Sequence, residues 1–396
     1  MPRRTVGLNT GVARGDAIAL TRALTRIDSR NPTLSPGAPG EKAVAASLAS
    51  ILEQWGLEVD LPDAAPGRPN LVARIGPPDT PALMFAGHLD TVATEGMSHD
   101  PFSGELRDGR IYGRGSTDMK SGVSAMCAAA ALALDRVPGP KRQIIIVAVA
   151  DEEYESLGMR ALLASGLTAE RAIITEPTRL SICPAHRGFV WIEIQFAGRA
   201  AHGSQYELGI DAIRHAGLVL AELDEIDHGA LTRITHPLLG RASLHAGVIE
   251  GGIGMNTYPD RCRLTLERRT LPGENGDSAM REVEGALERV RARRPELDAH
   301  ATMILAQMPS DVSVDSPLVT GLRDALVAEN LRPLIEGLGA WTDAALLNEA
   351  GIPTICFGPG DIATAHAHEE FVSTEEITHA TAVLTRVARD WLLGEE

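Results

Sequence analysis

The sequence predicts an α/β domain with a buried sheet, into which a smaller α+β domain is inserted. Three observations support this prediction. The 396 residues are more than one compact core usually organises. Short apolar runs alternate with helical segments in both terminal parts of the chain, whereas polar and apolar residues alternate along the strands between them. We therefore expect an outer domain of residues 1–186 and 303–396, and an inserted domain of residues 187–302.

The outer domain begins with two segments of helical periodicity, Asp16–Ile27 and Gly40–Trp55, joined by a Pro/Gly-rich loop. Four short apolar runs are expected to be strands: Leu71–Ile75, Ala82–Gly87, Ile144–Ala150 and Ala172–Thr175. Runs this apolar are typical of strands that are buried on both faces. Between the second and third runs, an Ala-rich helix is expected to follow Asp118 and to continue through Leu134.

The inserted domain is expected to be an antiparallel sheet with helices on one side. Three segments alternate polar and apolar residues, as strands with one face in water do: Trp191–Phe196, Gly247–Glu250 and Arg261–Thr270. Two segments have the pattern of amphipathic helices: Ile210–Glu225 and Ser278–Arg294. From about Met303 the α/β pattern returns, with a strand and a closing helix: Pro353–Phe357 and Thr374–Leu393.

Composition and charge exclude several classes of function. The 53 acidic against 37 basic residues give a net charge of −16, which argues against nucleic acid as a partner. The longest apolar run, Ala125–Leu134, is far shorter than the roughly 20 residues of a membrane span. The four cysteines are scattered, which argues against a disulfide framework or a thiolate metal site. No signal peptide is recognised after Met1, so we expect a cytoplasmic protein.

Acidic residues and histidines follow the expected strands, where ligands bind in open α/β sheets. The strands lead in turn to these side chains: His88 and Asp90, Asp151-Glu152-Glu153, Glu176, and His366. His88 and Asp90 point the same way on an extended chain, which suits a ligand imidazole and a carboxylate that orients it or ligates beside it. Taken singly, this pair is also explained by a strand end and a turn, and Asp118 by a helix N-cap.

The triplet Asp151-Glu152-Glu153 is the strongest single indication of a metal site. Successive carboxylates after a buried strand repel one another, and a cation would remove this repulsion and the desolvation penalty. A solvated surface turn is the alternative. Two imidazoles and three carboxylates could together hold two divalent ions if one carboxylate bridges: His88, Asp118, Glu153, Glu176 and His366. Ligation without sulfur suits Zn²⁺ first, with Co²⁺ and Mn²⁺ as alternatives, and leaves Glu152 as a general base.

Five stretches in this order resemble the dinuclear zinc peptidase/deacylase family of acetylornithine deacetylase, succinyl-diaminopimelate desuccinylase and glutamate carboxypeptidase. They are GHLDTV at 87–92, STDMKSG at 116–122, DEE at 151–153, TEP at 175–177 and AHAHEEF at 365–371. The resemblance covers nearly the whole chain from about Asp16. It implies a zinc-peptidase-like catalytic domain with a central mixed sheet, and an inserted lid that also serves as the dimerisation domain of a homodimer.

The resemblance also implies a role for each presumed metal ligand. Asp118 would bridge the two ions. His88 and Glu176 would complete the site of one ion, and Glu153 and His366 the site of the other.

Two further roles follow from the same resemblance. Glu152 would be the general base for a metal-bridging water, and Asp90 would support His88 from behind. His368 stands two residues past His366, where the family often has proline, so the choice between these two histidines stays open.

In the inserted domain, residues 198–204 resemble the lid motif whose histidine, here His202, reaches the partner's active site in many members and stabilises the oxyanion. Asn256 and Arg269 lie in segments resembling those that contact the substrate's carboxylate end. A capped loop, a turn and a salt bridge are the structural alternatives for these three residues. Trp341 stands where small residues are common, so the substrates of the named members are not transferred.

Other classes of function are less well supported. The stretch 113–122 is not a P-loop, because Met119 precedes Lys120 where glycine is needed, and no serine has the glycines of a nucleophile elbow. A binding protein without activity would be expected to lack the base or the bridging ligand. We therefore expect a metal-dependent amidohydrolase acting on N-acyl-L-amino acids, since glutamate at 176 resembles the deacylase branch. A metallo-carboxypeptidase or dipeptidase for a small peptide-like substrate is the alternative.

Overall fold

The computed structural model describes residues 11–395, so Met1 and the other residues in which no signal peptide was recognised lie outside the described part. The chain divides into two compact units. Of the described residues, the first comprises those up to 184, 312–336 and those from 342 onward, and the second comprises residues 185–311 and 337–341. None of the helices in residues 11–395 is both long enough and apolar enough to cross a membrane.

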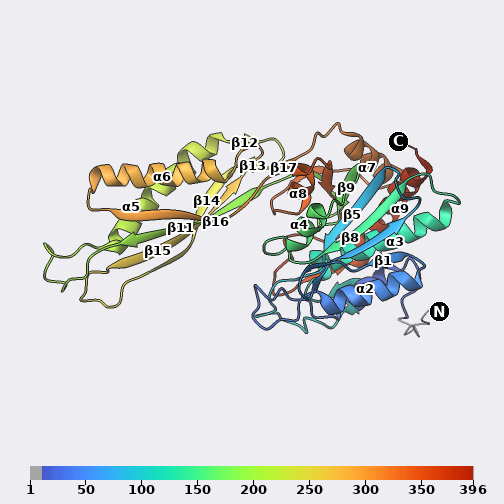
Figure 1. Ribbon diagram of the computed structural model, residues 1–396, viewed down its shortest axis with the longest axis horizontal. Helices are drawn as coiled ribbons and strands as arrows, with labels where there is room; N and C mark the ends of the chain where they lie inside the picture. The colour runs from blue at the N-terminus through green and yellow to red at the C-terminus, as the bar shows by residue number, and fades with distance from the viewer. Residues whose placement is uncertain (1–10, 396) are drawn as a thin grey trace. The chain divides into compact units, whose positions relative to one another are not determined.

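The first unit is built on a mixed sheet, as expected (Figure 1). Its strands follow the order β1 (Glu58–Asp60), β4 (Leu71–Ile75), β8 (Gln143–Val149), β5 (Ala82–His88), β9 (Arg171–Ile174), β19 (Thr354–Cys356) and β10 (Ile182–His186). The central strands β8, β5, β9 and β19 are parallel to their neighbours in this group, whereas β4 and β10 are antiparallel to the strands beside them. Every residue of β5 and β8 is buried, which explains their continuous apolar sequence.

Helices cover this sheet (Figure 1). On one side α3 (Ser121–Arg136) packs against α1 (Ala17–Thr25) and α9 (Thr374–Leu393), and α9 also contacts α7 (Pro317–Ala328). On the other side lie α4 (Leu157–Ala164) and α8 (Ala344–Glu349), while α2 (Lys42–Gln54) contacts β1. The Ala-rich sequence of α3 matches its burial, because small side chains allow the close approach of α1 and α9.

Short elements position the loops around the sheet. They are β2 (Asp63–Ala65), β3 (Arg68–Pro69), β6 (Glu105–Arg107), β7 (Arg110–Tyr112), β20 (Phe371–Ser373) and the helical turn η1 (Ser116–Lys120). Phe371 pairs with Tyr112 in an antiparallel ladder of β20 and β7. This pairing brings the chain around residue 370 beside the start of η1.

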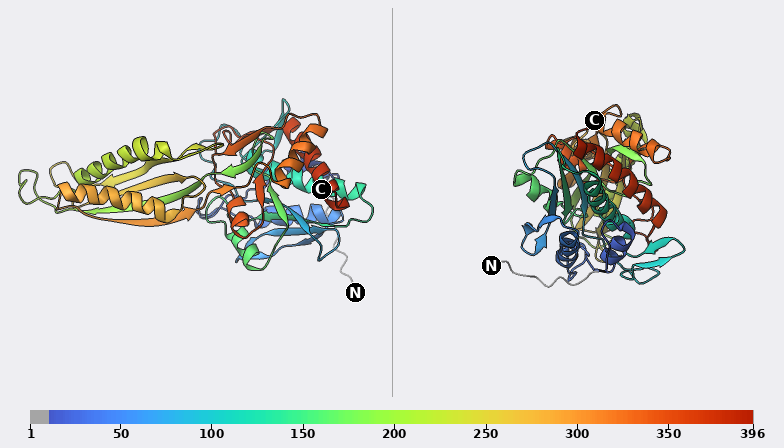
Figure 2. Two further views of the ribbon diagram at one scale, coloured as in Figure 1. Left: turned by 90° about the horizontal axis from the view of Figure 1, so that it is seen from above. Right: turned by 90° about the vertical axis from the view of Figure 1, so that its right-hand side faces the viewer.

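The second unit is an α+β unit, as expected. Its sheet has the antiparallel order β14 (Ser243–Gly251), β15 (Arg261–Thr270), β11 (Gly188–Ala197) and β16 (Asp298–Gln307). Helices α5 (Ala212–Glu225) and α6 (Gly276–Arg293) lie over one face of it (Figure 2). Both helices bury an apolar stripe against the alternating inward residues of the strands. The turns η2 (Ile226–Ala230) and η3 (Leu231–Arg233) and the short strands β12 (Thr235–His236) and β13 (Gly240–Arg241) follow α5.

The insert extends further than the sequence analysis placed it. The insert was expected to end at residue 302, whereas β16 runs on to Gln307 and β17 (Ser310–Asp311) also belongs to the second unit. The sequence of Met303–Ala306 is apolar and resembles that of a buried strand, but this segment pairs with β11 of the insert. The chain returns to this unit at 337–341, after the first residues of β18 (Ile335–Leu338).

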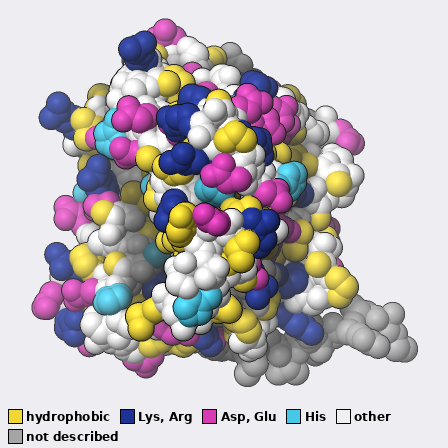
Figure 3. Space-filling view, turned by 90° about the vertical axis from the view of Figure 1, so that its left-hand side faces the viewer, with side chains coloured by type: hydrophobic (Ala, Val, Ile, Leu, Met, Phe, Trp, Pro, Cys, Tyr) yellow, Lys and Arg dark blue, Asp and Glu magenta, His cyan; other side chains and the backbone are white. Residues whose placement is uncertain are grey.

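Charged side chains of both signs are interspersed with hydrophobic ones on the face shown in Figure 3. On that face, the described residues form no extended basic patch of the kind that attracts a polyanion. This agrees with the net charge of −16.

Candidate active site

Three neighbouring parallel strands of the first unit bring the acidic residues and His88 to one edge of the sheet. β5 ends at His88, β8 leads into residues 151–153, and β9 leads to Glu176. The strands are adjacent in the order β8, β5, β9 and parallel, so their carboxyl ends meet at the same edge. His88, residues 151–153 and Glu176 therefore come together here.

Asp118 lies between two histidines. Its Oδ1 is 3.0 Å from Nε2 of His88, and its Oδ2 is 3.3 Å from Nε2 of His366. His366 Nε2 also lies 3.1 Å from Oε2 of Glu153. Burial opposes ionisation of Asp118, but hydrogen bonds with His366 and His88 hold its pKa below the ordinary value. A carboxylate that presents one oxygen to each of two imidazoles has the form of a bridging ligand.

Glu152 and Glu176 form a second group with His88. One ligand atom from each of these three residues falls within 4.8 Å of the others, and the same holds for His88, Asp118 and Glu153. Burial raises the pKa of Glu152 well above its usual value, with the charge of Glu176 adding to the effect. Burial likewise raises the pKa of Glu176. These carboxylates are costly to ionise together without a cation.

His88 is held in one tautomer by the backbone. Its Nδ1 donates a hydrogen bond to the carbonyl oxygen of Asp90 over 2.9 Å, while the carboxylate Oδ1 of Asp90 is 3.7 Å from the same nitrogen. Because Nδ1 uses its proton in this hydrogen bond, Nε2 is the ring nitrogen that faces Asp118 and Glu152. Asp90 therefore contacts His88 mainly through its carbonyl group, rather than through the carboxylate that the sequence suggested.

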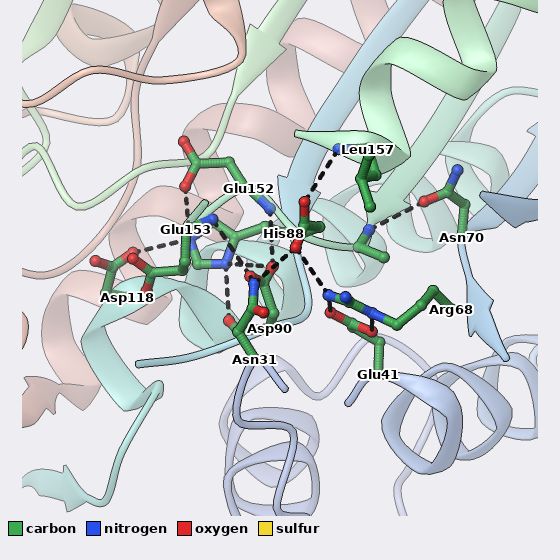
Figure 4. Close-up of polar contacts among 12 residues, drawn as sticks. Asn31, Glu41, Arg68, Asn70, His88, Asp90, Asp118, Glu152, Glu153 and Leu157 are labelled. Carbon is green, nitrogen blue, oxygen red and sulfur yellow. Dashed lines mark hydrogen bonds and ion pairs between the residues drawn. The ribbon is translucent and has the colours of Figure 1, made fainter. Parts of the chain in front are cut away.

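The carboxylate of Asp90 instead accepts hydrogen bonds from the acidic turn at residues 151–153 (Figure 4). Its Oδ1 accepts the backbone N–H of Glu152 over 3.1 Å, and its Oδ2 accepts that of Glu153 over 3.3 Å. Asn31 Nδ2 donates to Oδ2 of Asp90 over 2.8 Å. Burial raises the pKa of Asp90 to about 7. These hydrogen bonds thus fix the backbone from which the side chains of Glu152 and Glu153 extend.

A second buried carboxylate, Glu370, holds the backbone at Asp118. Its Oε1 accepts the N–H of Thr117 over 3.1 Å and that of Asp118 over 3.2 Å. Its Oε2 lies 2.6 Å from Nη1 of Arg114, which partly offsets the desolvation of this fully buried carboxylate. Burial raises the pKa of Glu370 to about 7. Glu370 and Arg114 were not singled out as functional residues in the sequence.

The structure distinguishes His366 from His368, the two histidines between which the sequence left the choice of a metal ligand open. His366 reaches Asp118 and Glu153, as described above. The carbonyl oxygen of His368 accepts the backbone N–H of Ser98 over 2.9 Å, and its ring is near Gly96. Of the two, His366 is the one whose ring nitrogen joins the carboxylate cluster.

The remaining candidates belong to the second unit. His202 is exposed, its Nδ1 lies 2.9 Å from Oγ of Ser204, and its strand bridge with Thr257 places it beside the Asn256 loop. Arg269 lies on β15, where its Nε donates to Oε1 of Glu267 over 2.6 Å and its guanidinium covers the ring of Phe189. The salt bridge considered for Arg269 is therefore present.

Trp341 joins an aromatic cluster of the second unit. Its ring meets those of Phe189 and His186 edge to face, each with 6.4 Å between centroids. Its Nε1 donates to the carbonyl oxygen of Met308 over 2.9 Å. The indole is thus fixed in position by packing and by a hydrogen bond.

Comparison with known proteins agrees with this arrangement. Residues 84–390 match the family described as Peptidase family M20/M25/M40. The acetylornithine deacetylase of Myxococcus xanthus is 31% identical over 342 residues, which cover 84% of this chain and 87% of that protein. The N-formyl-4-amino-5-aminomethyl-2-methylpyrimidine deformylase of Bacillus subtilis is 27% identical, with 93% of each chain covered. The crystal structure of a tripeptidase from Staphylococcus aureus has the same fold, with a TM-score of 0.77 at 19% identity over 96% of this chain and 99% of that chain.

Proposed function

Because the chain belongs to Peptidase family M20/M25/M40 and is a hydrolase of that family, we propose that it hydrolyses the amide bond of N-acyl-L-amino acids. The observation that carries this proposal is the cluster around His88, in which two imidazoles and four carboxylates meet at the edge of the sheet. Such a cluster suits hydrolysis assisted by metal ions.

The donor set fits two divalent ions. Asp118 would bridge, His88 and Glu176 would hold one ion, and Glu153 and His366 would hold the other. Because Nδ1–H of His88 is held by the backbone, Nε2 is the nitrogen that would bind a metal in place of the proton that it donates to Asp118. Zn²⁺ is the first choice for these nitrogen and oxygen donors, with Co²⁺ and Mn²⁺ as alternatives. When bound, the ions would polarise the scissile carbonyl and lower the pKa of water.

Glu152 would supply the proton chemistry. Its carboxylate lies beside His88, and desolvation raises its pKa, which suits a base that accepts a proton from water and then gives it to the leaving nitrogen. Asp90 would keep Glu152 in place through its backbone N–H.

The second unit would serve as lid and dimer interface. His202 would reach the active site of a partner subunit and donate to the oxyanion, and Asn256 and Arg269 would contact the carboxylate end of the substrate. β14 supports the homodimer, because it is an edge strand and its Val248 and Ile249 are about half exposed. We further propose that the enzyme acts in the cytoplasm, since the four cysteines are unpaired within the described residues.

Release of free amine from a panel of conjugates tests the proposal. The panel combines acetyl, formyl, succinyl and aminoacyl groups with several amino acids, because the curated relatives are named for both acetyl and formyl substrates. Hydrolysis of the acetyl, formyl or succinyl conjugates supports a deacylase. Cleavage confined to the aminoacyl conjugates would instead support a carboxypeptidase or dipeptidase, and no cleavage by metal-loaded protein would contradict the proposal.

A further inference from the structure

Arg68 joins two buried carboxylates behind the candidate metal site. Its Nε donates to Oε2 of Glu41 over 2.5 Å, and Nη2 donates to Oε1 of the same carboxylate (Figure 4). Nη2 also donates to Oδ1 of Asp151 over 3.1 Å. The side chains of Glu41 and Asp151 are fully buried, and that of Arg68 is 12% exposed. None of the five motifs includes Arg68 or Glu41.

Asp151 connects this guanidinium to the acidic turn. Its Oδ2 accepts the backbone N–H groups of Glu155 over 3.3 Å and of Leu157 over 3.4 Å. The φ angle of Asp151 is +68°, in the left-handed region that non-glycine residues seldom adopt. The hydrogen bonds of its side chain therefore hold a turn that the backbone alone would not favour.

Asn31 connects Asp151 to Asp90. Its Nδ2 donates one hydrogen to Oδ1 of Asp151 over 2.9 Å and the other to Oδ2 of Asp90 over 2.8 Å. Asp90 in turn accepts the N–H groups of Glu152 and Glu153. A continuous series of hydrogen bonds thus leads from Arg68 to the proposed base and to a proposed ligand.

Two carboxylates of this series are buried, and the positive charge of Arg68 stabilises both of them. Glu41 and Asp151 both face the same guanidinium, so its removal deprives two buried carboxylates of the cation that they share. Lysine cannot replace it fully, because an ammonium group lacks the planar fork that binds one carboxylate twice while donating to another.

We propose that Arg68 is a positioning residue that, through Asp151 and Asn31, fixes the turn presenting Glu152 and Glu153. This inference rests on the proposed function, since it assigns the turn to metal binding and proton transfer. Arg68 touches neither substrate nor metal. Its loss should therefore weaken metal binding and slow turnover, while the Michaelis constant changes little.

The test compares Arg68→Met, Arg68→Lys and Asn31→Ala with wild type. Zn²⁺ affinity is measured on metal-free protein by competition with a chelator, and kcat and KM are measured on reloaded enzyme. We expect Arg68→Met and Asn31→Ala to lose about 10–100-fold in Zn²⁺ affinity and in kcat, the usual effect of removing a partner behind a metal ligand. KM should change less than about threefold, and Arg68→Lys should recover part of the loss.

Arg386→Met is the matched control. It removes a different ion pair of the first unit, between Arg386 and Glu329, and should leave Zn²⁺ affinity and kcat at the wild-type values. Urea unfolding separates a general loss of stability from a change at the site. If Arg68→Met does not fold, the Zn²⁺ affinity and kcat of Asn31→Ala test the proposal.

Three results would overturn the inference. Zn²⁺ affinity and kcat within twofold of wild type in Asn31→Ala or folded Arg68→Met would show that the turn does not depend on this series. An equal loss in Arg386→Met would show a general effect of stability. Wild-type protein that binds no divalent metal would overturn this inference together with the proposed function, whereas wild-type protein that binds Zn²⁺ without hydrolysing any conjugate would overturn the proposed function alone.

Discussion

Glu152 and His88 lie side by side at the edge of the sheet, with 3.9 Å between Oε2 of the glutamate and Nε2 of the histidine. The closest carboxylate to that nitrogen is Asp118, at 3.0 Å. Both carboxylates therefore lie near Nε2 of His88, and that of Asp118 is the nearer of the two. We propose that Asp118 is a ligand and Glu152 the base, and substitutions at the acidic turn test these roles.

Replacement of Glu152 by glutamine should slow turnover without emptying the site. The amide keeps the shape of the side chain but cannot accept the proton, so kcat should fall by roughly 10²–10⁴-fold. Metal content, measured by atomic emission on the purified variant, should stay near that of wild type. Glu153→Gln is the matched comparison, because it alters a proposed ligand on the same turn and should lose metal. If Glu152→Gln lost its metal while Glu153→Gln kept it, the two roles would have to be exchanged.

The two histidines of the 365–371 stretch give a second prediction. His366→Ala should lose metal and activity, because its ring nitrogen contacts Asp118 and Glu153. His368→Ala should keep both, because the hydrogen bond from Ser98 to residue 368 uses its backbone oxygen, which alanine retains. Metal content and kcat of the two variants check this directly. Loss of metal in His368→Ala alone would reverse the choice.

Removal of metal gives a third prediction. Chelation should abolish hydrolysis, and Zn²⁺, Co²⁺ or Mn²⁺ should restore it, because the cluster contains no sulfur and its buried carboxylates need a cation. Metal-free protein should also unfold at a lower temperature than metal-loaded protein, since the ion binds the folded state preferentially. Full turnover by demonstrably metal-free protein would exclude a metal-dependent reaction.

Much of the fold could be predicted because buried strands, strands with one wet face and amphipathic helices each have a distinctive sequence. Leu71–Ile75 and Arg261–Thr270 match β4 and β15 residue for residue, and Thr374–Leu393 matches α9. β10 and β16 were missed or misplaced for a physical reason. β10 contains apolar residues without alternation, and in β16 the alternation stops at Met303. Only the pairing of β16 with β11 shows that Met303–Gln307 belongs to the insert.

The metal-site candidates could be predicted because their residue types are unusual at strand ends, but the groups that hold them could not. Arg68 and Glu41 lie far from the motifs in sequence and resemble ordinary surface charges. Their importance depends on burial and on a contact across the fold, neither of which periodicity reveals. Asn31 lies in a Pro/Gly-rich loop, and its role likewise depends on contacts across the fold that the sequence does not reveal. Arg68 stands shortly before the buried strand Leu71–Ile75, and this position is the one feature of the sequence that could have drawn attention to it.

His186 provides a prediction about pH and stability. Burial lowers the pKa of this histidine to about 4, and its Nε2 has no hydrogen-bond partner within the described residues. Between about pH 6.5 and 4 the unfolded chain binds a proton that the folded chain does not, so stability is complete above this range and falls as the pH is lowered through it. Between pH 7 and 5 this single group should lower the free energy of unfolding by about 2 kcal/mol.

Urea unfolding at the two pH values measures this loss. His186→Phe retains an aromatic ring beside Trp341 but cannot be protonated, so its stability should fall less over the same range. Other groups titrate equally in both proteins, and the difference between the two slopes therefore reports on residue 186. Equal slopes would show that His186 is not kept neutral in the folded protein.

The last prediction places His202 in the active site of a partner subunit. His202 is exposed, and it lies in the second unit whereas the metal cluster lies in the first. An imidazole that donates to the developing oxyanion contributes about 10²–10³-fold to kcat, so His202→Ala should be slow while its metal content is normal. Ser204→Ala is the control, because it removes only the hydroxyl that contacts Nδ1 of His202 and should have a smaller effect.

The decisive test mixes His202→Ala subunits with Glu152→Gln subunits, each nearly inactive alone. If His202 acts across a dimer interface, one site of each heterodimer combines an intact Glu152 with the intact His202 of the partner subunit. Activity should then reappear, approaching half of the wild-type value per heterodimer, because the other site lacks both groups. If His202 acts within its own subunit, every site of the heterodimer lacks one of the two groups. Heterodimers verified by differential tagging that hydrolyse no faster than the two parents would therefore exclude a role for His202 across the interface.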